Sequence, residues 1–379
     1  MKKQKFSRRD VLRCSLTGSA ALTLGTVYAS AARAAAPPPE AITPQLIEAA
    51  KKEGKVVWYT SIDLSVSEKI AASFKEKFGG IEVRVERTGA ERVFQRVGQE
   101  YASNIHAVDV VNSSDAAHLL AWKKQGILLP YVPEDVAKYY KPEHRDADGT
   151  FAGFRATLCP IAYNIKLVKA EDAPTSFKDL LDPKWKGKIV KAHPGYSGTI
   201  LTATFEMVRD IGWEYYENLA KQNIMQVQSA TDPPKKLALG ERSVMADGAE
   251  YNILLLKEAG QPVEAVYPTE GTPFVIGPNG IFRAAPNPNA AKLFQNYCFT
   301  PEGQSIVIEA GGLRSLHAQV KEKPGRKPLA DIKLMKEDAE SAEKQSEEIK
   351  ARYQKIFRVR RETALRNDQC ENNSAGATL

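Results

Sequence analysis

The chain has 379 residues, of which 26% are charged and 43% are hydrophobic. These fractions exclude a polytopic membrane protein and a chain that is disordered throughout. At roughly 150 residues per domain, the length predicts two or three domains. The formal net charge is +7, but residues 1–34 hold seven basic side chains and one acidic one. The remainder has 46 basic and 45 acidic residues, so we expect no nucleic-acid partner.

The N-terminus has the pattern of an export signal. Residues 1–13 carry most of its basic side chains, residues 14–32 are uncharged, and small residues around Ala34 offer a cleavage site. Ser7–Leu12 is similar to the twin-arginine signal of an exporter that moves folded proteins. A membrane anchor is the alternative, since the uncharged stretch is about long enough to span a bilayer. Its Gly, Ser and Thr make it weakly apolar, so we predict a cleaved signal over residues 1–34 and a periplasmic protein.

Export would leave three cysteines in the mature chain, Cys159, Cys298 and Cys370. An odd number in an oxidising compartment leaves at least one thiol free or paired between chains, and it predicts no disulfide framework. The sequence has no CxxC or HExxH motif, and no two of its five histidines lie four residues apart. We therefore expect no metal site and no cofactor.

The first part of the mature chain alternates strand and helix patterns. After a proline-rich linker, a short helix leads into an apolar run that is typical of a buried parallel strand. Ser65–Glu68 forms a capping box, and apolar residues then recur every four positions from Val66 to Phe78, which predicts a helix. A strand, a helix and a strand in this order need a crossover, so we predict a parallel sheet and an α/β fold. The expected elements are helix Thr43–Glu53, strand Lys55–Tyr59, helix 65–78, strand 81–85, a helix through Val93 and Val97, strand Val108–Val111 and helix Ser113–Gln125.

The pattern breaks over residues 127–150 and resumes with the extended run Cys159–Tyr163, where we place a first crossing between two lobes. A second set of strands and helices follows. Val263–Tyr267 and Pro273–Ile276 are then expected to be strands that return to the first lobe. A last helix is expected over Asp331–Phe357, with a solvated charged face. The second set comprises strands Lys188–Ala192, Asn223–Gln228 and Ser243–Asp247 and helices Ser197–Arg209, Glu214–Lys221, Pro234–Leu239 and Glu250–Gly260.

These elements predict a division of the mature chain into two lobes. Lobe 1 is discontinuous and is expected over residues 35–155 and 270–357. Lobe 2 is expected over residues 156–269. Residues 358–379 are mostly polar or small, and we expect them to form a disordered tail.

Several segments resemble one family of exported proteins. They are Val57–Ser61, Leu119–Pro133, Asp179–Ile189, Pro194–Thr199, Gly240–Gln261 and Thr300–Gln304. The most specific is Asp179–Ile189, DLLDPKWKGKI, which is expected to be a loop with a structural role. Together they resemble periplasmic solute-binding proteins of ABC importers, in particular the ferric-ion-binding-protein-like family. The resemblance implies a monomer with a type 2 periplasmic binding fold, whose hinged lobes close on a solute and deliver it to an inner-membrane permease with its ATPase.

Ligands of such sheets bind beyond the carboxyl ends of the strands, where helix N-termini present free N–H groups. Polar side chains stand at four such places. Each could equally ease a turn or cap a helix. The family resemblance implies that an anion lies at Ser197-Gly198. The candidate ligand-binding residues are Thr60 and Ser61; Ser113 and Ser114; Ser197, Gly198 and Thr199; and Asp247, Glu250 and Tyr251.

The sequence departs from the iron-binding pattern of that family. Iron-binding members carry two adjacent tyrosines where this chain has Glu250 and Tyr251, and they supply a histidine near the position of Asp63. Glu250, Tyr251 and Asp63 are still hard oxygen ligands, so ferric iron stays an alternative. Arg155, near the first crossing, could pair bidentately with an anion. An organic anion or zwitterion, with its acid on Ser197–Thr199 or Arg155 and any amine on Glu250, fits these residue types better.

We therefore expect the substrate-binding component of an ABC transporter. Its solute would be a small organic acid, phosphonate or sugar phosphate, with ferric iron or an iron chelate as the alternative. A secreted hydrolase is a second class of function, because Gly195–Ser197 begins like the G-x-S-x-G turn of serine hydrolases. Thr199 replaces its last glycine, however, and His193 lies too close in sequence to serve easily as the base. We expect no enzyme.

Overall fold

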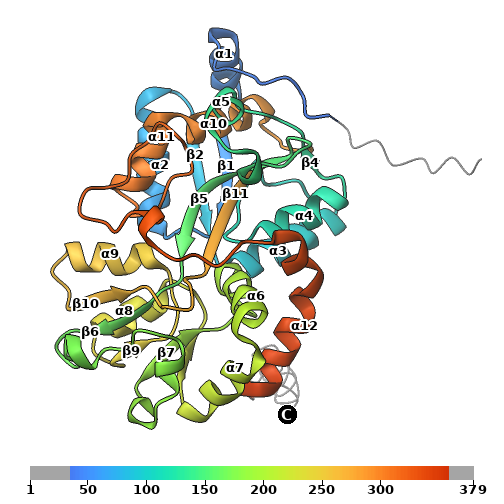
Figure 1. Cartoon of the computed structure of the whole chain (residues 1–379). Helices are drawn as coiled ribbons and strands as arrows, with labels where there is room; N and C mark the ends of the chain where they lie inside the picture. Colours follow the sequence, from blue (N-terminus) through green and yellow to red (C-terminus); the bar gives the residue numbers. More distant parts are fainter. Residues whose placement is uncertain (1–34, 358–379) are drawn as a thin grey trace, which may run out of the picture. The chain divides into compact units, whose positions relative to one another are not determined.

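The computed structural model describes residues 35–357 (Figure 1). The predicted signal peptide over residues 1–34 and the predicted tail over residues 358–379 lie outside the described residues. Two separate β-sheets with helices packed on them confirm the expected α/β class and two-lobed fold. Within the described part of the chain, no helix is long and apolar enough to cross a membrane.

The sheet of lobe 1 is built around the buried strand β1 (Lys55–Thr60). β1 pairs in parallel with β2 (Glu82–Arg87) and with β3 (Val110–Asn112), as the strand–helix–strand pattern predicts. A strand from much later in the chain, β11 (Phe274–Phe282), pairs antiparallel with β3, so the sheet is mixed. The strand order is β2-β1-β3-β11-β4, where β4 is Leu128–Leu129, and β5 (Phe151–Leu158) also pairs with β11.

Helices pack their apolar faces on this sheet. α2 (Leu64–Lys77) buries Phe74, whose ring meets that of Phe294 edge to face with centroids 5.2 Å apart. The predicted capping box at Ser65 is wrong, because the N-cap of α2 is Asp63, whose carboxylate accepts from the Ser65 backbone N–H at 3.2 Å. The other helices of lobe 1 are α1 (Pro44–Glu53), α3 (Ala90–Ala102), α4 (Ala116–Lys124), α5 (Glu134–Tyr139), α10 (Pro288–Phe299) and α11 (Pro301–Glu309).

The sheet of lobe 2 has the strand order β10-β6-β9-β7-β8. The sequence predicts that Val263–Tyr267 returns to lobe 1, but β10 pairs antiparallel with β6 and so belongs to lobe 2. That prediction is wrong, since only β11 returns. The strands are β6 (Ile161–Asn164), β7 (Ile189–Ala192), β8 (Met225–Val227), β9 (Val244–Met245) and β10 (Val263–Val266), and the helices are α6 (Gly198–Ile211), α7 (Trp213–Leu219), α8 (Asp232–Ala238) and α9 (Glu250–Glu258).

The DLLDPKWKGKI run has the structural role that the sequence predicts. It forms two 3-10 turns, Lys178–Leu181 and Pro183–Trp185, and it buries Leu180 and Trp185 in the core of lobe 2. Other 3-10 turns cover Pro142–His144, Ala170–Asp172, Ala220–Gln222 and Leu329–Asp331.

Two crossings join the lobes. The chain passes from β5 to β6 through Cys159 and Pro160, and it returns between β10 and β11. β5 and β11 pair antiparallel from Phe274 opposite Leu158 onward, so the two crossings lie side by side. Cys159 and Cys298 are buried free thiols, whereas Cys370 lies outside the described residues.

The C-terminal segment contacts both lobes. Residues before the last helix run along the second crossing, where the Thr272 backbone N–H donates to the Lys333 carbonyl at 2.8 Å. The helix α12 (Ala339–Phe357) therefore begins at Ala339 and not at Asp331 as predicted. Met335 and Tyr353 are buried in the core of lobe 2, although the predicted boundaries assign residues 270–357 to lobe 1. The other boundaries stay a prediction.

Two carboxylates hold the start of β11, those of the fully buried Glu206 and of the partly buried Glu337. Glu206 of α6 accepts from the Phe274 backbone N–H at 2.9 Å, and Glu337 accepts from the Ile276 N–H at 3.3 Å. Burial raises the pKa of Glu206 well above its usual range and that of Glu337 to about 8, and nearby acids add to both shifts. Both groups therefore bind a proton more tightly in the folded protein than in the unfolded chain.

This raised pKa predicts a stability that falls with rising pH. Between the unfolded pKa of about 4.5 and about 8, the folded state retains the Glu337 proton that the unfolded chain loses. The penalty grows by up to ~1.4 kcal/mol per pH unit. Glu337→Gln keeps an acceptor for Ile276, so its gain in free energy of unfolding should be near zero at pH 4.5 and largest at pH 8. Urea unfolding across this range measures the difference, and the exposed Glu309→Gln, which should show no such trend, is the control.

Candidate functional site

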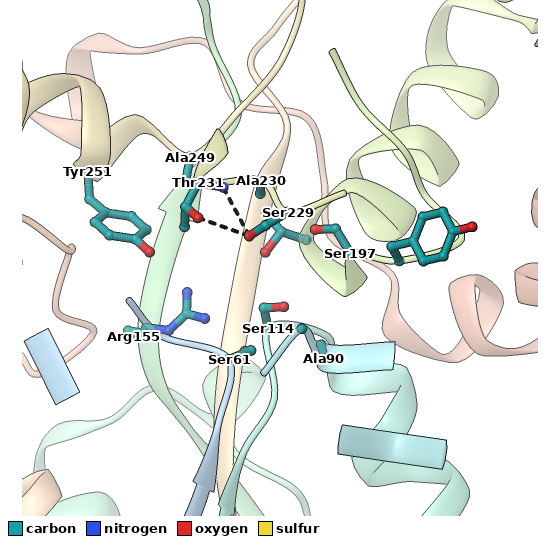
Figure 2. A pocket seen from close by; sticks show the side chains of 13 residues that line it. Ser61, Ala90, Ser114, Arg155, Ser197, Ser229, Ala230, Thr231, Ala249 and Tyr251 are labelled. Carbon is teal, nitrogen blue, oxygen red and sulfur yellow. Dashed lines mark hydrogen bonds between the residues drawn. The ribbon is translucent and has the colours of Figure 1, made fainter. Parts of the chain in front are cut away.

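A pocket lies where the two lobes meet (Figure 2). The space between its lining atoms, which includes adjoining open solvent, is about 330 Å³. Lobe 1 contributes Ser61, Gly89, Ala90, Ser114 and Arg155, and lobe 2 contributes Ser197, Thr199, Ser229, Thr231, Ala249 and Tyr251 among others. No carboxylate and no histidine lines it, so the described pocket has hydroxyls, backbone groups and one cation as its polar partners.

Helix N-termini from both lobes converge on this pocket. α3, α4, α6 and α9 all begin at or next to lining residues. α3 follows Gly89 and α9 follows Ala249, neither of which makes a side-chain cap, so first-turn N–H groups stay available to a ligand. Each N-terminus carries partial positive charge, which stabilises an anion at that point.

Arg155 lines this pocket. Its side chain comes from β5, and the residue is only 3% exposed. Nη1 donates to the Thr157 hydroxyl at 2.7 Å, Nε has no partner, and no carboxylate of residues 35–357 forms an ion pair with the guanidinium. Burial lowers the pKa of Arg155. A buried cation without a counter-charge is costly, and an anionic group in the pocket would supply that counter-charge.

Gly277 leaves the room that the guanidinium occupies. Gly277 lies opposite Arg155 on β11, and a Cβ added to it would lie 3.0 Å from both Cζ of Arg155 and the Ser113 carbonyl oxygen. The backbone oxygen cannot retreat easily, so the arginine must move.

We predict that Gly277→Ala displaces Arg155 and lowers the free energy of unfolding by about 1–3 kcal/mol, the usual cost of overpacking. Urea unfolding measures the loss, and a crystal structure of the variant locates the guanidinium. Gly98→Ala is the matched control, because a Cβ there meets nothing within 4 Å. An unmoved Arg155 would contradict the prediction.

Tyr251 brings a phenol to the same side of the pocket. Figure 2 shows its hydroxyl and the Arg155 guanidinium on neighbouring positions of the lining. Burial raises the pKa of Tyr251 to about 12, although Arg155 acts to lower it. The phenol is therefore neutral at neutral pH and can donate a hydrogen bond to an anion.

The structure brings together six of the residues that the sequence singles out as ligand-binding candidates. Ser61, Ser114, Arg155, Ser197, Thr199 and Tyr251 all line the pocket. Three candidates lie just behind it. The Thr60 hydroxyl accepts from the Ile62 N–H at 3.2 Å, and the Ser113 hydroxyl pairs with His118 Nδ1 at 2.9 Å. Gly198 packs against lobe 1, where an added Cβ would lie 2.7 Å from Cβ of Asp115.

The acidic candidates differ from the sequence prediction. Both carboxylate oxygens of Glu250 accept from Arg314, each at 2.9 Å, and Asp247 pairs with the buried Lys191 at 2.6 Å. Asp63 caps α2 and pairs with Lys235 at 3.3 Å. None of the three lines the pocket. Glu250 is therefore not placed to bind the amine of a zwitterion, because its carboxylate is already paired with the buried guanidinium of Arg314.

Sequence reasoning missed the lining residues that precede α8. Ser229 and Thr231 hydroxyls lie 3.0 Å apart, and the Ser229 N–H donates to Asp232 at 2.9 Å. The sequence predicts that this helix begins at Pro234, but it begins at Asp232. A serine and a threonine just before an aspartate followed by prolines is a helix-start signal, which could have placed these hydroxyls at the site.

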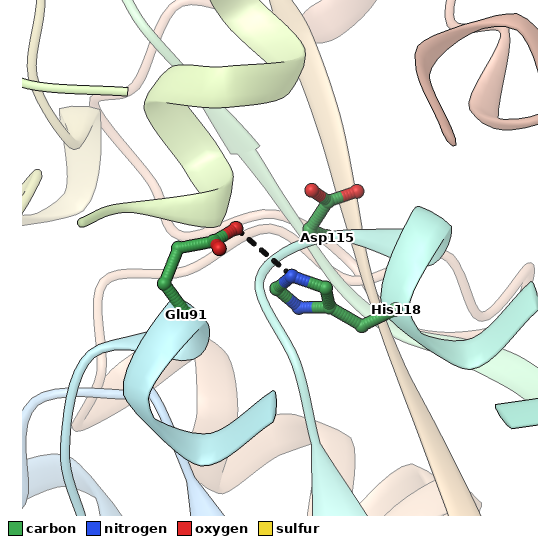
Figure 3. A group of neighbouring side chains, drawn as sticks. All are labelled: Glu91, Asp115 and His118. Carbon is green, nitrogen blue, oxygen red and sulfur yellow. Dashed lines mark hydrogen bonds and ion pairs between the residues drawn. The ribbon is translucent and has the colours of Figure 1, made fainter. Parts of the chain in front are cut away.

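One cluster has the residue types of a metal site, Glu91, Asp115 and His118 (Figure 3). His118 Nε2 lies 2.9 Å from Glu91, and Lys350 Nζ lies 2.7 Å from the other Glu91 oxygen. Burial alone would lower the pKa of His118 and raise that of Glu91. The attraction between the two groups outweighs burial and raises the pKa of His118. The same attraction, together with that of Lys350, lowers the pKa of Glu91 to about 2. Two cations thus already neutralise Glu91, and we interpret the cluster as an ion-pair network.

Two sheets, two crossings and a pocket between the lobes define a solute-binding protein of the type 2 periplasmic fold. The chain belongs to the family described as bacterial extracellular solute-binding protein, which matches residues 107–333. Proteins of this family are transport components and not enzymes, so the hydrolase alternative is set aside, as the sequence predicts.

Individual relatives have different solutes. The chain is 25% identical over 357 residues to iron uptake protein A1 of Synechocystis sp., covering 90% of this chain and 94% of that one. It is 26% identical over 246 residues to a putative 2-aminoethylphosphonate-binding periplasmic protein of Salmonella typhimurium, covering 62% and 69%. The structure of AfuA from Actinobacillus pleuropneumoniae, with fructose-6-phosphate bound, is similar with a TM-score of 0.75 and 25% identity over 81% of this chain and 100% of that one.

Proposed function

We propose that this protein captures a small organic anion in the interlobe pocket for import by an ABC transporter. One observation carries the proposal: Arg155 is buried without an acidic partner where helix N-termini of both lobes converge. A carboxylate, phosphonate or phosphate group would supply the missing counter-charge. The sugar phosphate bound to AfuA and the name of the Salmonella relative support the same chemical class.

Each lining group has a proposed role. Arg155 holds the anionic group, and Ser197 with Thr199 adds hydroxyl and N–H donors from the start of α6. Tyr251, Ser229 and Thr231 bind polar groups on the rest of the solute. An anion fits better than a zwitterion, because no lining carboxylate is present for an amine.

Ferric iron is the alternative solute, and the name of the Synechocystis relative, iron uptake protein A1, supports it. Iron needs several anionic oxygen ligands, whereas the lining offers hydroxyls, the Tyr251 phenol with its raised pKa, and a guanidinium that repels a cation. We therefore place the organic anion first.

The cellular setting follows from the proposed role. A twin-arginine-type signal would export the chain to the periplasm, where it acts as a monomer and delivers the solute to an inner-membrane permease with its ATPase. Neither a metal nor another cofactor takes part.

A binding screen tests the proposal. The chain from Ala35 is heated with sugar phosphates, phosphonates, di- and tricarboxylates, and ferric citrate, and positive results are repeated by calorimetry. A solute at 100 times its dissociation constant adds about 2.7 kcal/mol to the free energy of unfolding, which raises the unfolding midpoint by several degrees. We expect one iron-free organic anion to do so and to be recovered unchanged. Stabilisation by ferric iron alone would overturn the proposal.

A further inference from the structure

The last helix, α12, packs on helices of both lobes. In Figure 1 it runs down one side of the molecule, from α3 and α4 of lobe 1 toward α7 of lobe 2. Three of the four helices that begin at the pocket, α3, α4 and α6, contact α12 directly. It thus forms a third connection between the lobes, in addition to the two crossings.

The contacts of α12 with lobe 2 are mostly apolar. Ala342 and Ile349 are buried against Leu201 and Phe205 of α6. Further along, Tyr353 is fully buried, and its ring lies edge to face with that of Tyr216, with centroids 5.7 Å apart. Separating these surfaces would expose large apolar areas to water, which is unfavourable. We therefore expect α12 to stay with lobe 2 when the lobes move apart.

Two ion pairs join α12 to lobe 1. Lys350 Nζ lies 2.7 Å from Glu91 Oε2, with the two side chains 13% and 4% exposed. Glu91 is held in turn by His118 of α4 at 2.9 Å (Figure 3). Nearer the start of the helix, Lys124 pairs with Glu343 at 2.6 Å. Charged groups recover hydration when such a contact opens, so this side can separate and re-form.

The lobes are closed in this structure. Arg92 of α3 donates to the Gln228 side chain of lobe 2 at 2.7 Å, and the start of α6 packs against the starts of α3 and α4 at Gly198. The Lys350–Glu91 pair is therefore an ion pair of the closed form.

We propose that α12 moves with lobe 2 and that Lys350, by pairing with Glu91 of lobe 1, acts as a latch that favours the closed form. The latch lies beside the pocket and not in it, because neither residue lines the pocket. It would set how far the protein closes on its own, and thereby how much of the binding energy closure consumes.

Interlobe distances measured without any solute test the latch, so the outcome does not depend on the proposed function. Spin labels replace exposed lysines in pairs: Lys69→Cys on lobe 1 with Lys169→Cys on lobe 2, and Lys355→Cys on α12 with each of these. Cys370→Ser removes the thiol that lies outside the described residues. We expect an open and a closed population for the lobe 1–lobe 2 pair, and a single distance between α12 and lobe 2.

Variants then weaken the latch. Lys350→Met should raise the ratio of open to closed molecules about tenfold, since it leaves a buried carboxylate with one cation fewer. Glu91→Gln should act in the same direction. In the double variant the shift should be clearly smaller than the product of the two single shifts, because the residues act through one pair. Lys344→Met, an exposed lysine of the same helix, should change nothing.

Three results would overturn the proposal. The first is that Lys350→Met and the Lys344→Met control have the same distribution of lobe 1–lobe 2 distances. Another is single shifts that multiply fully in the double variant. The third is an α12–lobe 2 distance that changes as the lobes open. Circular dichroism of each variant shows whether it is folded, and Lys350→Gln, which keeps a polar side chain, replaces Lys350→Met if that variant does not fold.

Discussion

Arg155→Met should lower the affinity for the organic anion by about 100-fold or more. Removing one partner of a buried, hydrogen-bonded charge pair costs roughly 2–5 kcal/mol of binding energy, and each 1.4 kcal/mol is about a factor of ten. The same variant should raise the free energy of unfolding of the unliganded protein, because methionine fills similar space without a buried charge that lacks a partner. Calorimetry measures the first effect and urea unfolding the second.

The opposite signs make this prediction specific. If Arg155 had a purely structural role, its truncation would lower both the affinity for the anion and the free energy of unfolding. Arg84→Met is the control, because the Arg84 side chain is 67% exposed and should change neither quantity. Retained affinity in Arg155→Met would mean that the helix N-termini alone hold the anion.

Arg314→Met should lower the free energy of unfolding by about 3–5 kcal/mol, as expected when a buried ion pair loses one partner. Arg314 and Glu250 are each 1% exposed and are joined by two hydrogen bonds of 2.9 Å. Without the guanidinium, Glu250 keeps only the hydroxyl of Tyr267, at 2.6 Å, among its side-chain partners. Urea unfolding at neutral pH measures the loss.

A second variant separates charge from packing. Adding Glu250→Gln to Arg314→Met removes the stranded carboxylate and should recover a large part of the lost stability. The exposed pair Lys138–Glu134, with side chains 53% and 45% exposed, gives the comparison: Lys138→Met should cost less than 1 kcal/mol. A double variant no more stable than Arg314→Met would show that the arginine acts through its packing.

Local patterns predict much of this fold. The apolar run at Val57 and the four-residue spacing that includes Phe74 predict a buried strand and a one-sided helix, because burial of those side chains stabilises both elements wherever they pack. The errors arise where contacts with residues distant in the sequence decide which strands pair and where a helix begins. β10 stays in lobe 2 because β6 is its partner, and α12 starts late because Thr272 pairs with the chain before it. No local pattern contains those partners.

The candidate site shows the same limit. Hydroxyls that follow strands, such as Ser61 and Ser114, can be placed at the pocket from the sequence, because the ends of parallel strands meet at one edge. The sequence predicts Glu250 as a ligand because this residue begins a helix beyond a strand. Its true partner, Arg314, lies 64 residues away. Whether a polar side chain faces the pocket or an ion pair thus depends on tertiary contacts.

The division of the pocket between the lobes has a consequence for release. Arg155 and the starts of α3 and α4 belong to lobe 1, whereas the starts of α6 and α9 belong to lobe 2. Each lobe alone provides only part of the hydrogen-bond donors to the solute and leaves the solute accessible to water. A transporter that draws the two halves apart therefore need not touch the solute, since the separation itself turns a tight complex into two weak ones.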